Sequence, residues 1–295
     1  MSDMLKEGTG LLEKAPAKIN LSLVVRGRRA DGYHELNSLV AFADCGDVVS
    51  VRAADKLWLD VSGPFAKGLG TDDTNLVLQA IRRFDDYLGV KTTGHFTLEK
   101  NLPVASGIGG GSADAAATLR LLGRLHGRDV GQHALASLGL CIGADVPVCL
   151  EATPAMMWGK GELIERIDAL PDFWFVLVNP GVSVSTADVF ARLNAPPLIE
   201  KEAGPVMPAL ANVTALTVWL EAHGNGMERA AMRIAPAIFD AAAALAATRD
   251  CRIARMSGSG ATCFGIYDDE KAARAAEAAL RIAHPDWWIA AARRL

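Results

Sequence analysis

A run of glycines directly before an alanine-rich segment, within residues 103–122, constrains the fold more than any other feature of the sequence. Its glycines are Gly107, Gly109, Gly110 and Gly111. Glycine lets backbone N–H groups approach a ligand without interference from a Cβ atom. A helix that opens near Ser112 and covers residues 113–125 would add unpaired N–H groups and the positive end of its dipole. The stretch therefore predicts a phosphate-binding loop in a protein that binds a nucleotide.

Two familiar phosphate loops do not fit this stretch. In the dinucleotide-binding pattern G-x-G-x-x-G, counted from Gly107, the third glycine falls at Ser112. The P-loop needs Gly-Lys followed by Ser or Thr, and the chain contains no such triplet. Ser106, Ser112 and Asp114 supply hydroxyl and carboxylate groups suited to phosphate or Mg²⁺. A tight turn before a core helix remains the alternative on these residues alone.

The composition is that of an ordinary globular protein and excludes several classes. The 295 residues are 51% hydrophobic and 22% charged, with room for one large domain or two smaller ones. A net charge of −4 provides no basic field for nucleic acid. No segment approaches the ~20 consecutive apolar residues of a membrane span. Residues 1–18 mix charges where a secretory signal has an apolar core. We therefore expect a cytoplasmic protein that binds neither nucleic acid nor membranes.

The cysteines and histidines show no metal or disulfide pattern. The five cysteines are scattered and contain no C-x-x-C pair, which favours reduced, buried thiols in a cytoplasmic protein. The six histidines show no H-x-x-x-H or Cys/His spacing, which argues against a structural zinc site.

Strands and helices alternate irregularly along the chain, which favours an α+β fold over a doubly wound sheet. Residues 17–25 alternate apolar and polar side chains, the period of a strand with one buried face, so Lys18 and Asn20 share its polar face. The predicted helices cover residues 76–88, 113–125, 132–138, 186–193, 213–222, 227–247 (broken near Pro236) and 270–282. The other predicted strands follow Tyr33-His34 and cover residues 47–51, 57–61, 95–99, 155–159, 162–167, 173–178, 252–256 and 263–267, with a last one near Trp288.

Asp145 lies between Gly143 and Pro147, which favour a non-helical turn around a single carboxylate. Aspartates in turns often bond their own backbone, so a purely structural role remains open. The same is true of Lys18, which could lie on the solvated face of an edge strand. Tyr33 could likewise be a partly exposed aromatic after a turn.

Three separate motifs of the chain resemble those of the GHMP kinase superfamily. They are residues 16–21 (PAKINL), residues 103–117 (PVASGIGGGSADAAA) and residues 256–262 (MSGSGAT). The resemblance implies a two-domain α+β fold. Its N-terminal domain, ribosomal-protein-S5-domain-2-like, would cover residues 1–165, and its C-terminal ferredoxin-like domain residues 166–295. In the second motif, Ala113 stands where the family usually has a second serine.

Three further blocks narrow the reaction that the resemblance implies. They are residues 29–34 (RADGYH), residues 143–147 (GADVP) and residues 179–183 (NPGVS). The implied protein is a kinase that uses ATP and Mg²⁺. It would phosphorylate the 2-hydroxyl of a cytidine-diphosphate-linked methylerythritol, a small-molecule substrate, in non-mevalonate isoprenoid synthesis. We expect it to be a monomer or a homodimer.

The resemblance also implies roles for single residues. Asp145 would orient or deprotonate the acceptor hydroxyl, and Lys18 would stabilise developing negative charge. Ser112 is the candidate contact for Mg²⁺. The implied substrate-binding residues are Asn20, Tyr33, His34, Thr186 and Phe190. The implied ATP-binding residues are Pro103, Val104, Ala105, Ser106, Gly107, Ile108, Gly109, Gly110, Gly111, Ser112 and Ala113.

Three other interpretations remain open at this level. A sibling kinase could act on mevalonate, homoserine or a sugar, although Tyr33-His34 and residues 179–181 argue against it. A regulatory module could bind a nucleotide without catalysis, although the chain has both Lys18 and Asp145. A dinucleotide-dependent oxidoreductase is disfavoured by Ser112, which stands where that fingerprint needs glycine.

Overall fold

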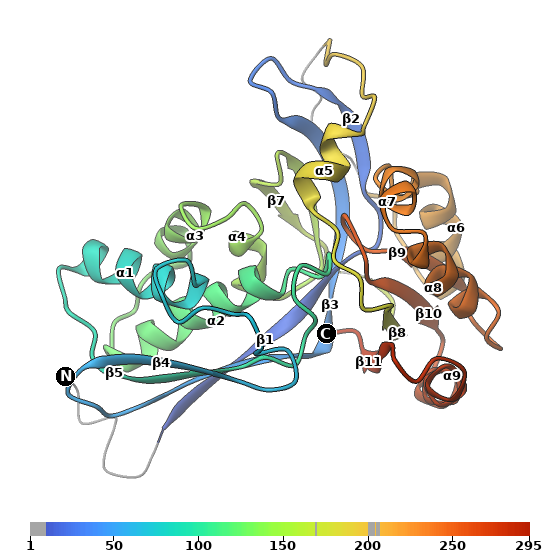
Figure 1. Cartoon of the computed structure of the whole chain (residues 1–295). Coiled ribbons are helices and arrows are strands. Elements are labelled where there is room, and N and C mark those ends of the chain that lie inside the picture. The colour runs from blue at the N-terminus through green and yellow to red at the C-terminus, as the bar shows by residue number, and fades with distance from the viewer. Residues whose placement is uncertain (1–9, 169, 200–203, 205–206) are drawn as a thin grey trace. The chain divides into compact units, whose positions relative to one another are not determined.

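The computed structural model describes residues 10–168, 170–199, 204 and 207–295, and it mixes helices and strands along the whole described chain (Figure 1). Residues 1–9, part of the segment in which no secretory signal is expected, lie outside the described residues. Contacts divide the chain into two compact units. The first unit comprises the described residues up to Ala17, Gly46–Val104 and Gly109–Ala152. The second comprises Lys18–Cys45, Ala105–Ile108 and the described part of Thr153–Leu295.

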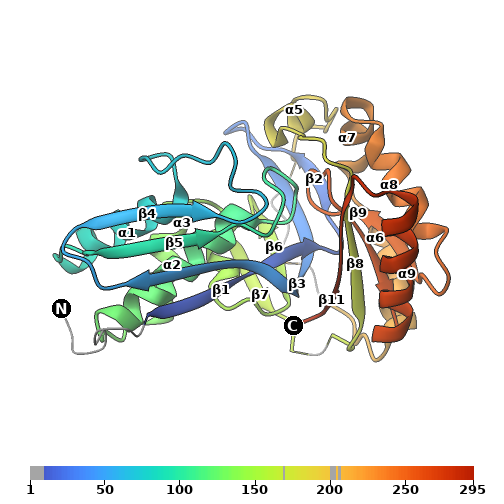
Figure 2. The same ribbon diagram turned by 60° about the horizontal axis from the view of Figure 1, so that its bottom comes forward.

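The first unit packs helices on one face of its strands (Figures 1 and 2). Strand β3 (His34–Arg52) pairs antiparallel with β5 (Gly94–Glu99) through residues 48–52, and β5 pairs in parallel with β4 (Leu57–Ser62). Strand β1 (Leu11–Asn20) also pairs with β3. The helices are α1 (Leu76–Leu88), α2 (Gly110–Leu125), α3 (Gln132–Leu140) and α4 (Val146–Cys149).

Local signals explain where α1 begins and ends. Asn75 precedes the helix and its Oδ1 accepts a hydrogen bond from the backbone N–H of Val77 at 3.0 Å. Gly89 ends the helix in the left-handed conformation, with φ 65°. The helix buries apolar side chains at the spacing of one helical face, namely Val77, Leu78, Ala80, Ile81 and Phe84. It contacts α2, whose buried alanines let the two backbones approach closely.

The second unit contains a four-stranded antiparallel sheet in the order β11–β8–β10–β9. Its strands are β8 (Trp174–Asn179), β9 (Ile253–Met256), β10 (Cys263–Tyr267) and β11 (Trp288–Arg293). The helices of the unit are α5 (Thr186–Ala191), α6 (Val213–His223), α7 (Glu228–Ile234), α8 (Ala237–Ala246) and α9 (Glu270–Ala283). Helices α8 and α9 cover one face of the sheet, as Figure 2 shows. This arrangement agrees with the ferredoxin-like layout expected for the C-terminal part.

Further strands of the second unit pair along the first half of β3. Strand β2 (Val24–Arg28) and strand β6 (Ala155–Gly159) both pair antiparallel with β3, and β7 (Leu163–Arg166) pairs with β6. The two strands predicted over residues 155–159 and 162–167 are therefore confirmed, and they form a hairpin. Strands β1 and β3 each contribute residues to both units, so the predicted boundary between residues 165 and 166 stays a prediction.

The α+β class is confirmed, and so is the break near Pro236, which separates α7 from α8. The strand predicted over residues 47–51 is confirmed, although it is the end of the long β3 rather than a separate strand. Two predicted ranges are wrong. Residues 17–25 are not one strand, because β1 ends at Asn20 and β2 begins at Val24. Helix α2 begins at Gly110 rather than near Ser112, because two glycines of the loop adopt helical conformation despite their low propensity.

The cysteines form no disulfide among the described residues. Cys149 and Cys263 are buried, as predicted. Cys45 and Cys251 are only partly buried and Cys141 is exposed, so the prediction of buried thiols is wrong for these three. Among the described residues, no helix combines the length and the apolar character that spanning a bilayer requires.

Candidate active site

The glycine loop, residues 103–113, has the backbone conformation that its composition predicts. Gly107 and Gly109 have positive φ angles of 75° and 64°, and Ala105 also lies in the left-handed region at 51°. Gly109 directly precedes α2 and, as a glycine, has no side chain that could cap the helix. The first backbone N–H groups of a helix have no intrahelical partner, so this end of α2 can donate to an anion.

Burial differs among the predicted ATP-binding residues. Val104, Ala105 and Gly111 are exposed, whereas Gly107, Gly109, Gly110 and Ser112 are partly exposed. Pro103, Ser106, Ile108 and Ala113 are buried. The loop therefore combines an accessible backbone with apolar anchors, while Ser106, only 4% exposed, lies inside the protein.

The three sequence motifs meet at the hydroxyl group of Ser257 in the second unit. Its Oγ accepts a hydrogen bond from the backbone N–H of Asn20 at 3.0 Å and donates one to the carbonyl oxygen of Gly107 at 2.9 Å. The backbone N–H of Thr262 also donates to the carbonyl oxygen of Ser106 at 3.0 Å. A Cβ atom added at Gly107 would lie 2.5 Å from the carbonyl oxygen of Ser257. Only glycine fits there, so the third motif supports the glycine loop directly.

The polar side chains at the end of β1 and just after it are buried, contrary to the prediction of one buried and one polar face. Lys18, Asn20 and Ser22 are only 3%, 5% and 2% exposed. The face is covered because other segments supply hydrogen-bond partners: Asn20 donates through Nδ2 to Ser38 Oγ at 2.7 Å, and Ser38 donates to the carbonyl oxygen of Ser22. The alternative of Lys18 on a solvated edge strand is therefore wrong.

Aromatic and hydroxyl groups among the predicted substrate residues form two contacts in the second unit. The rings of His34 and Phe190 stack with their centroids 4.8 Å apart. Burial, with a smaller effect of the nearby Arg28 charge, lowers the pKa of His34 and favours its neutral form. The hydroxyl groups of Thr186 and Ser259 lie within hydrogen-bond distance at 2.7 Å. Helix α5 is capped by Ser185, whose Oγ accepts a hydrogen bond from the N–H of Asp188 at 3.3 Å.

Tyr33 extends from the turn before β3 and is 60% exposed. The ammonium group of Lys160 lies 4.6 Å from the centroid of its ring. An exposed aromatic ring beside the stacked His34 is available to a planar ligand. The alternative of a partly exposed turn aromatic describes the same geometry, so ligand contact by Tyr33 stays a prediction.

Asp145 directly precedes the short helix α4 in the first unit. It lies in a turn closed by a hydrogen bond from the N–H of Val146 to the carbonyl oxygen of Gly143 at 3.0 Å, and its φ of −86° and ψ of −10° suit the third residue of a type I turn. The predicted turn around this carboxylate is therefore confirmed. Pro147 is compatible with helix here because proline suits the first turn. The carboxylate makes no capping hydrogen bond to α4. A Cβ atom at Gly143 would lie 4.0 Å from Ser112 Oγ, so the segment before Asp145 borders the start of α2.

The donor set limits how a metal ion could be held. The described residues contain no group of three or more His, Cys, Asp or Glu side chains arranged for a metal. Mg²⁺ often retains waters and binds through substrate phosphates with few protein ligands, and Ser112 on the first turn of α2 fits such a role. Asp114, predicted to serve phosphate or Mg²⁺, is buried and ion-paired to Lys100 instead.

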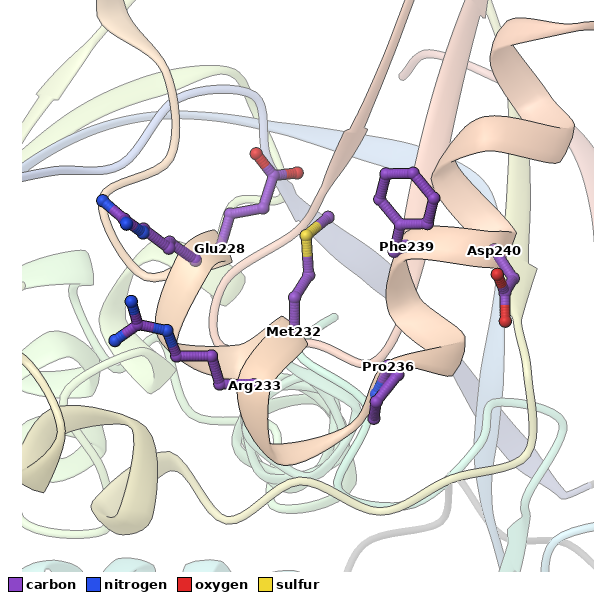
Figure 3. A pocket seen from close by; sticks show the side chains of 7 residues that line it. Glu228, Met232, Arg233, Pro236, Phe239 and Asp240 are labelled. Atoms are coloured by element: carbon purple, nitrogen blue, oxygen red, sulfur yellow. The ribbon is translucent and has the colours of Figure 1, made fainter.

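A cavity of about 450 Å³ lies at the junction of α7 and α8 in the second unit (Figure 3). It is lined by Glu228, Arg229, Met232, Arg233, Pro236, Phe239 and Asp240. None of these is a predicted site residue. Glu228 also accepts a hydrogen bond from the N–H of Met256 at 3.0 Å, just before the Ser257 loop.

Three serines with hydrogen bonds at these contacts are not among the predicted site residues, namely Ser257, Ser259 and Ser38. Ser257 and Ser259 belong to the third motif, so their place in the sequence was a usable signal. Ser38 carries no such signal, because a serine within a strand is uninformative until its neighbours are known.

Comparisons with known proteins place this geometry in a family. The family model for the N-terminal domain of GHMP kinases matches residues 75–152, and the model for their C-terminal domain matches residues 191–286. A 4-diphosphocytidyl-2-C-methyl-D-erythritol kinase of Parvibaculum lavamentivorans is 53% identical over 94% of this chain and 96% of its own length. A protein of the same name from Cereibacter sphaeroides is 50% identical over 95% of this chain and 97% of its own.

Solved structures agree with this assignment. The crystal structure of a 4-(cytidine 5′-diphospho)-2C-methyl-D-erythritol kinase superposes with a TM-score of 0.75 at 32% identity, covering 96% of this chain and 99% of that one. A homoserine kinase from Cytophaga hutchinsonii reaches a TM-score of 0.71 at 18% identity, covering 100% and 97% of the two chains, which shows a shared fold alone. This chain belongs to the GHMP kinases and, within them, to the family of 4-diphosphocytidyl-2-C-methyl-D-erythritol kinases.

Proposed function

We propose that this protein is an ATP-dependent kinase that phosphorylates the 2-hydroxyl of 4-diphosphocytidyl-2-C-methyl-D-erythritol, a step of non-mevalonate isoprenoid precursor synthesis. The observation that carries the proposal is 53% identity, over nearly the whole of both chains, to a kinase named for this substrate. The stacked His34 and Phe190 support it, because a cytosine ring is a planar group suited to aromatic contact.

The glycine loop is the proposed seat of the ATP phosphates. Phosphoryl transfer asks a protein mainly to align two anions and to neutralise charge. The backbone N–H groups at the start of α2 would bind phosphate oxygens, and Gly107 would let the loop lie against the Ser257 turn. Mg²⁺ held by the phosphates and Ser112 would supply further charge neutralisation.

Lys18 and Asp145 are the proposed catalytic residues. Asp145 would accept the proton of the acceptor hydroxyl or orient it for attack, which requires hydrogen-bond reach in the substrate complex. Lys18, buried on β1, would stabilise negative charge that develops during transfer. Burying a charged ammonium group costs free energy, because the group loses its contacts with water. The burial of Lys18 therefore favours a functional role for its charge.

The proposed acceptor site uses residues of the second unit. Tyr33, His34 and Phe190 would contact the cytosine, and Asn20 and Thr186 would donate or accept hydrogen bonds with the polar part of the substrate. Asn20 already donates to Ser38, which leaves its amide oxygen as the proposed acceptor of a substrate hydroxyl.

Steady-state transfer from ATP tests the proposal. Phosphorylation of 4-diphosphocytidyl-2-C-methyl-D-erythritol, measured by ADP release and by product mass, is expected to exceed that of mevalonate and homoserine by several orders of magnitude. If transfer to mevalonate or homoserine is as fast or faster, the proposed substrate is wrong and that acceptor takes its place. ADP release without any acceptor dependence would contradict kinase activity on small molecules.

The likeness to a homoserine kinase does not favour that substrate, because an identity of 18% shows the fold alone. The cytoplasmic location and the choice between monomer and homodimer stay predictions.

A further inference from the structure

Three charged side chains are buried together in the first unit, and the proposed chemistry does not use them. Lys100, Asp47 and Asp114 are 3%, 0% and 3% exposed. The ammonium group of Lys100 donates to Asp47 Oδ2 and, at 2.8 Å, to Asp114 Oδ2. Burial alone would lower the pKa of Lys100, but the carboxylates of Asp114 and Asp47 outweigh it and raise the pKa, so the ammonium stays charged. Together these three side chains form a charge network.

The charge network holds the chain where it enters the glycine loop. Asp47 lies on β3, and its Oδ1 accepts hydrogen bonds from the backbone N–H groups of Asn101 and Leu102, at 2.6 and 2.8 Å. Pro103, the first residue of the loop, follows directly. One carboxylate therefore anchors both Lys100 and the backbone that leads into the loop.

The same network reaches the helix that leaves the loop. Asp114 lies on α2 four residues after Gly110, the first residue of that helix. A Cβ atom at Gly110 would lie 3.1 Å from Lys100 Nζ and 3.6 Å from Asp47 Oδ2. The network thus lies against the first turn of α2, whose N–H groups are the proposed phosphate ligands, and it connects this turn to β3.

Stability alone does not explain the charge network. Removing charges from water is costly, and apolar side chains of similar volume often stabilise a protein as well or better. Here one cation faces two carboxylates, and Asp114 Oδ1 has no hydrogen-bond partner although it is buried. The network does fix geometry, because each of its hydrogen bonds sets the position of one element relative to another.

We propose that Lys100, Asp47 and Asp114 are positioning residues, which hold the start of α2 and the entry of the glycine loop in the geometry that binds the nucleotide phosphates. This inference rests on the proposed function, in which the loop binds ATP. It adds residues to that function that contact neither substrate. A displacement of about 1 Å can lower the reaction rate at an aligned catalytic site about 100-fold, so even a small shift of α2 has a measurable effect.

Substitutions at Asp114 separate position from stability. Asp114→Ala removes one of the two acceptors of Lys100, in a helix already rich in alanine, whereas Asp114→Asn retains an oxygen that can accept the same hydrogen bond. Leu122→Ala is the matched control, because Leu122 is fully buried on the same helix, about 12 Å beyond Asp114 at 1.5 Å per residue. It lowers stability by leaving a cavity and does not touch the loop.

ADP binding measured by titration calorimetry is the main readout, because it needs no acceptor. Asp114→Ala is expected to weaken ADP binding and to raise KM for ATP at least about tenfold, with KM for the acceptor unchanged. Asp114→Asn should stay within about threefold of the unsubstituted protein. Leu122→Ala should lower the melting temperature at least as much as Asp114→Ala and leave ADP affinity within about twofold.

The following results would overturn the inference. ADP affinity of Asp114→Ala within about twofold of the unsubstituted protein, with a lower melting temperature, would mean a purely structural role. Equal losses of affinity in Asp114→Asn and Asp114→Ala would show that the hydrogen bond to Lys100 does not matter. If Asp114→Ala does not fold, Asp114→Leu, which refills the lost volume, takes its place with the same expectations. ADP binding without transfer to the proposed acceptor would refute the substrate and leave this test intact, whereas absence of ADP binding would refute both.

Discussion

Replacing Gly107 with alanine tests whether the close backbone contact between the glycine loop and the Ser257 turn is needed for stability and for nucleotide binding. Gly107 combines two features that glycine alone tolerates. Its φ angle of 75° is left-handed, and an added Cβ atom would lie 2.5 Å from the carbonyl oxygen of Ser257 and 2.8 Å from the backbone nitrogen and oxygen of Gly260. All three neighbouring atoms belong to the backbone, so none can rotate out of the way.

The expected cost follows from these two features. The left-handed conformation costs an L-residue roughly 1–2 kcal/mol. Forcing extra volume into a packed site costs roughly 1–3 kcal/mol. Alanine also reduces the freedom of the unfolded chain, which offsets about 0.4–1 kcal/mol. We therefore expect Gly107→Ala to lower the free energy of unfolding by about 3 kcal/mol.

Gly181→Ala is the matched control. Gly181 lies in the same unit with a φ angle of 77°, and an added Cβ atom there would meet nothing within 4 Å. It carries the same conformational strain without the close contact, so its expected cost is only about 1 kcal/mol. Urea unfolding followed by circular dichroism measures both variants, and calorimetry measures their ADP affinity. Gly107→Ala should also lose ADP affinity, whereas Gly181→Ala should stay within about twofold of the unsubstituted protein.

Equal destabilisation by the two substitutions would refute the reasoning, because the contact with Ser257 would then contribute nothing beyond the backbone angle. If Gly107→Ala is destabilised but binds ADP with unchanged affinity, the contact between Gly107 and the Ser257 turn does not contribute to nucleotide binding.

Three further predictions concern single side chains. Asp145→Asn should lower kcat at least about 100-fold while ADP affinity, measured by calorimetry, changes little; near-normal turnover would remove Asp145 from its proposed role. Lys18→Met should lower kcat by about 100-fold or more, with a smaller change in ATP affinity, and an unchanged kcat would speak against charge stabilisation by Lys18. Among Cys141, Cys149 and Cys263, a maleimide should modify the exposed Cys141 in the native protein and the two buried thiols only after unfolding, since burial raises the pKa of Cys263. Loss of the fast-reacting thiol in Cys141→Ser checks the assignment, and rapid labelling of Cys263 in the folded protein would contradict it.

Local features of the sequence predicted the elements well where the signal was itself local. The range of α1 follows from its apolar spacing, with a capping asparagine before it and a glycine after it. The break between α7 and α8 follows from one proline. The alternation around Lys18 correctly indicated a strand and placed Lys18 and Asn20 on one face.

The same pattern predicted the wrong environment for that face, which is buried and not exposed to water. A strand whose polar side chains alternate with apolar ones normally exposes them to water. Here the side chain of Asn20 donates a hydrogen bond to Ser38, and its backbone N–H donates one to Ser257, which is 237 residues away in the chain. Asp114 shows the same limit: beside the glycines it indicated a phosphate or metal ligand, whereas its neighbour in space is Lys100. Nothing near Lys100 in the sequence signals that its ammonium group is buried between two carboxylates.

The sequence by itself determined the glycine loop, the helix behind it, the α+β class and the family, because each rests on backbone preferences or on motifs within a few residues. Only the tertiary structure decided that Lys18 is buried, that Ser257 links Asn20 to Gly107, and that Lys100 pairs with Asp47 and Asp114. The physical reason is that burial and hydrogen bonding of a polar side chain depend on the segments that pack against it, and those segments are distant in the chain.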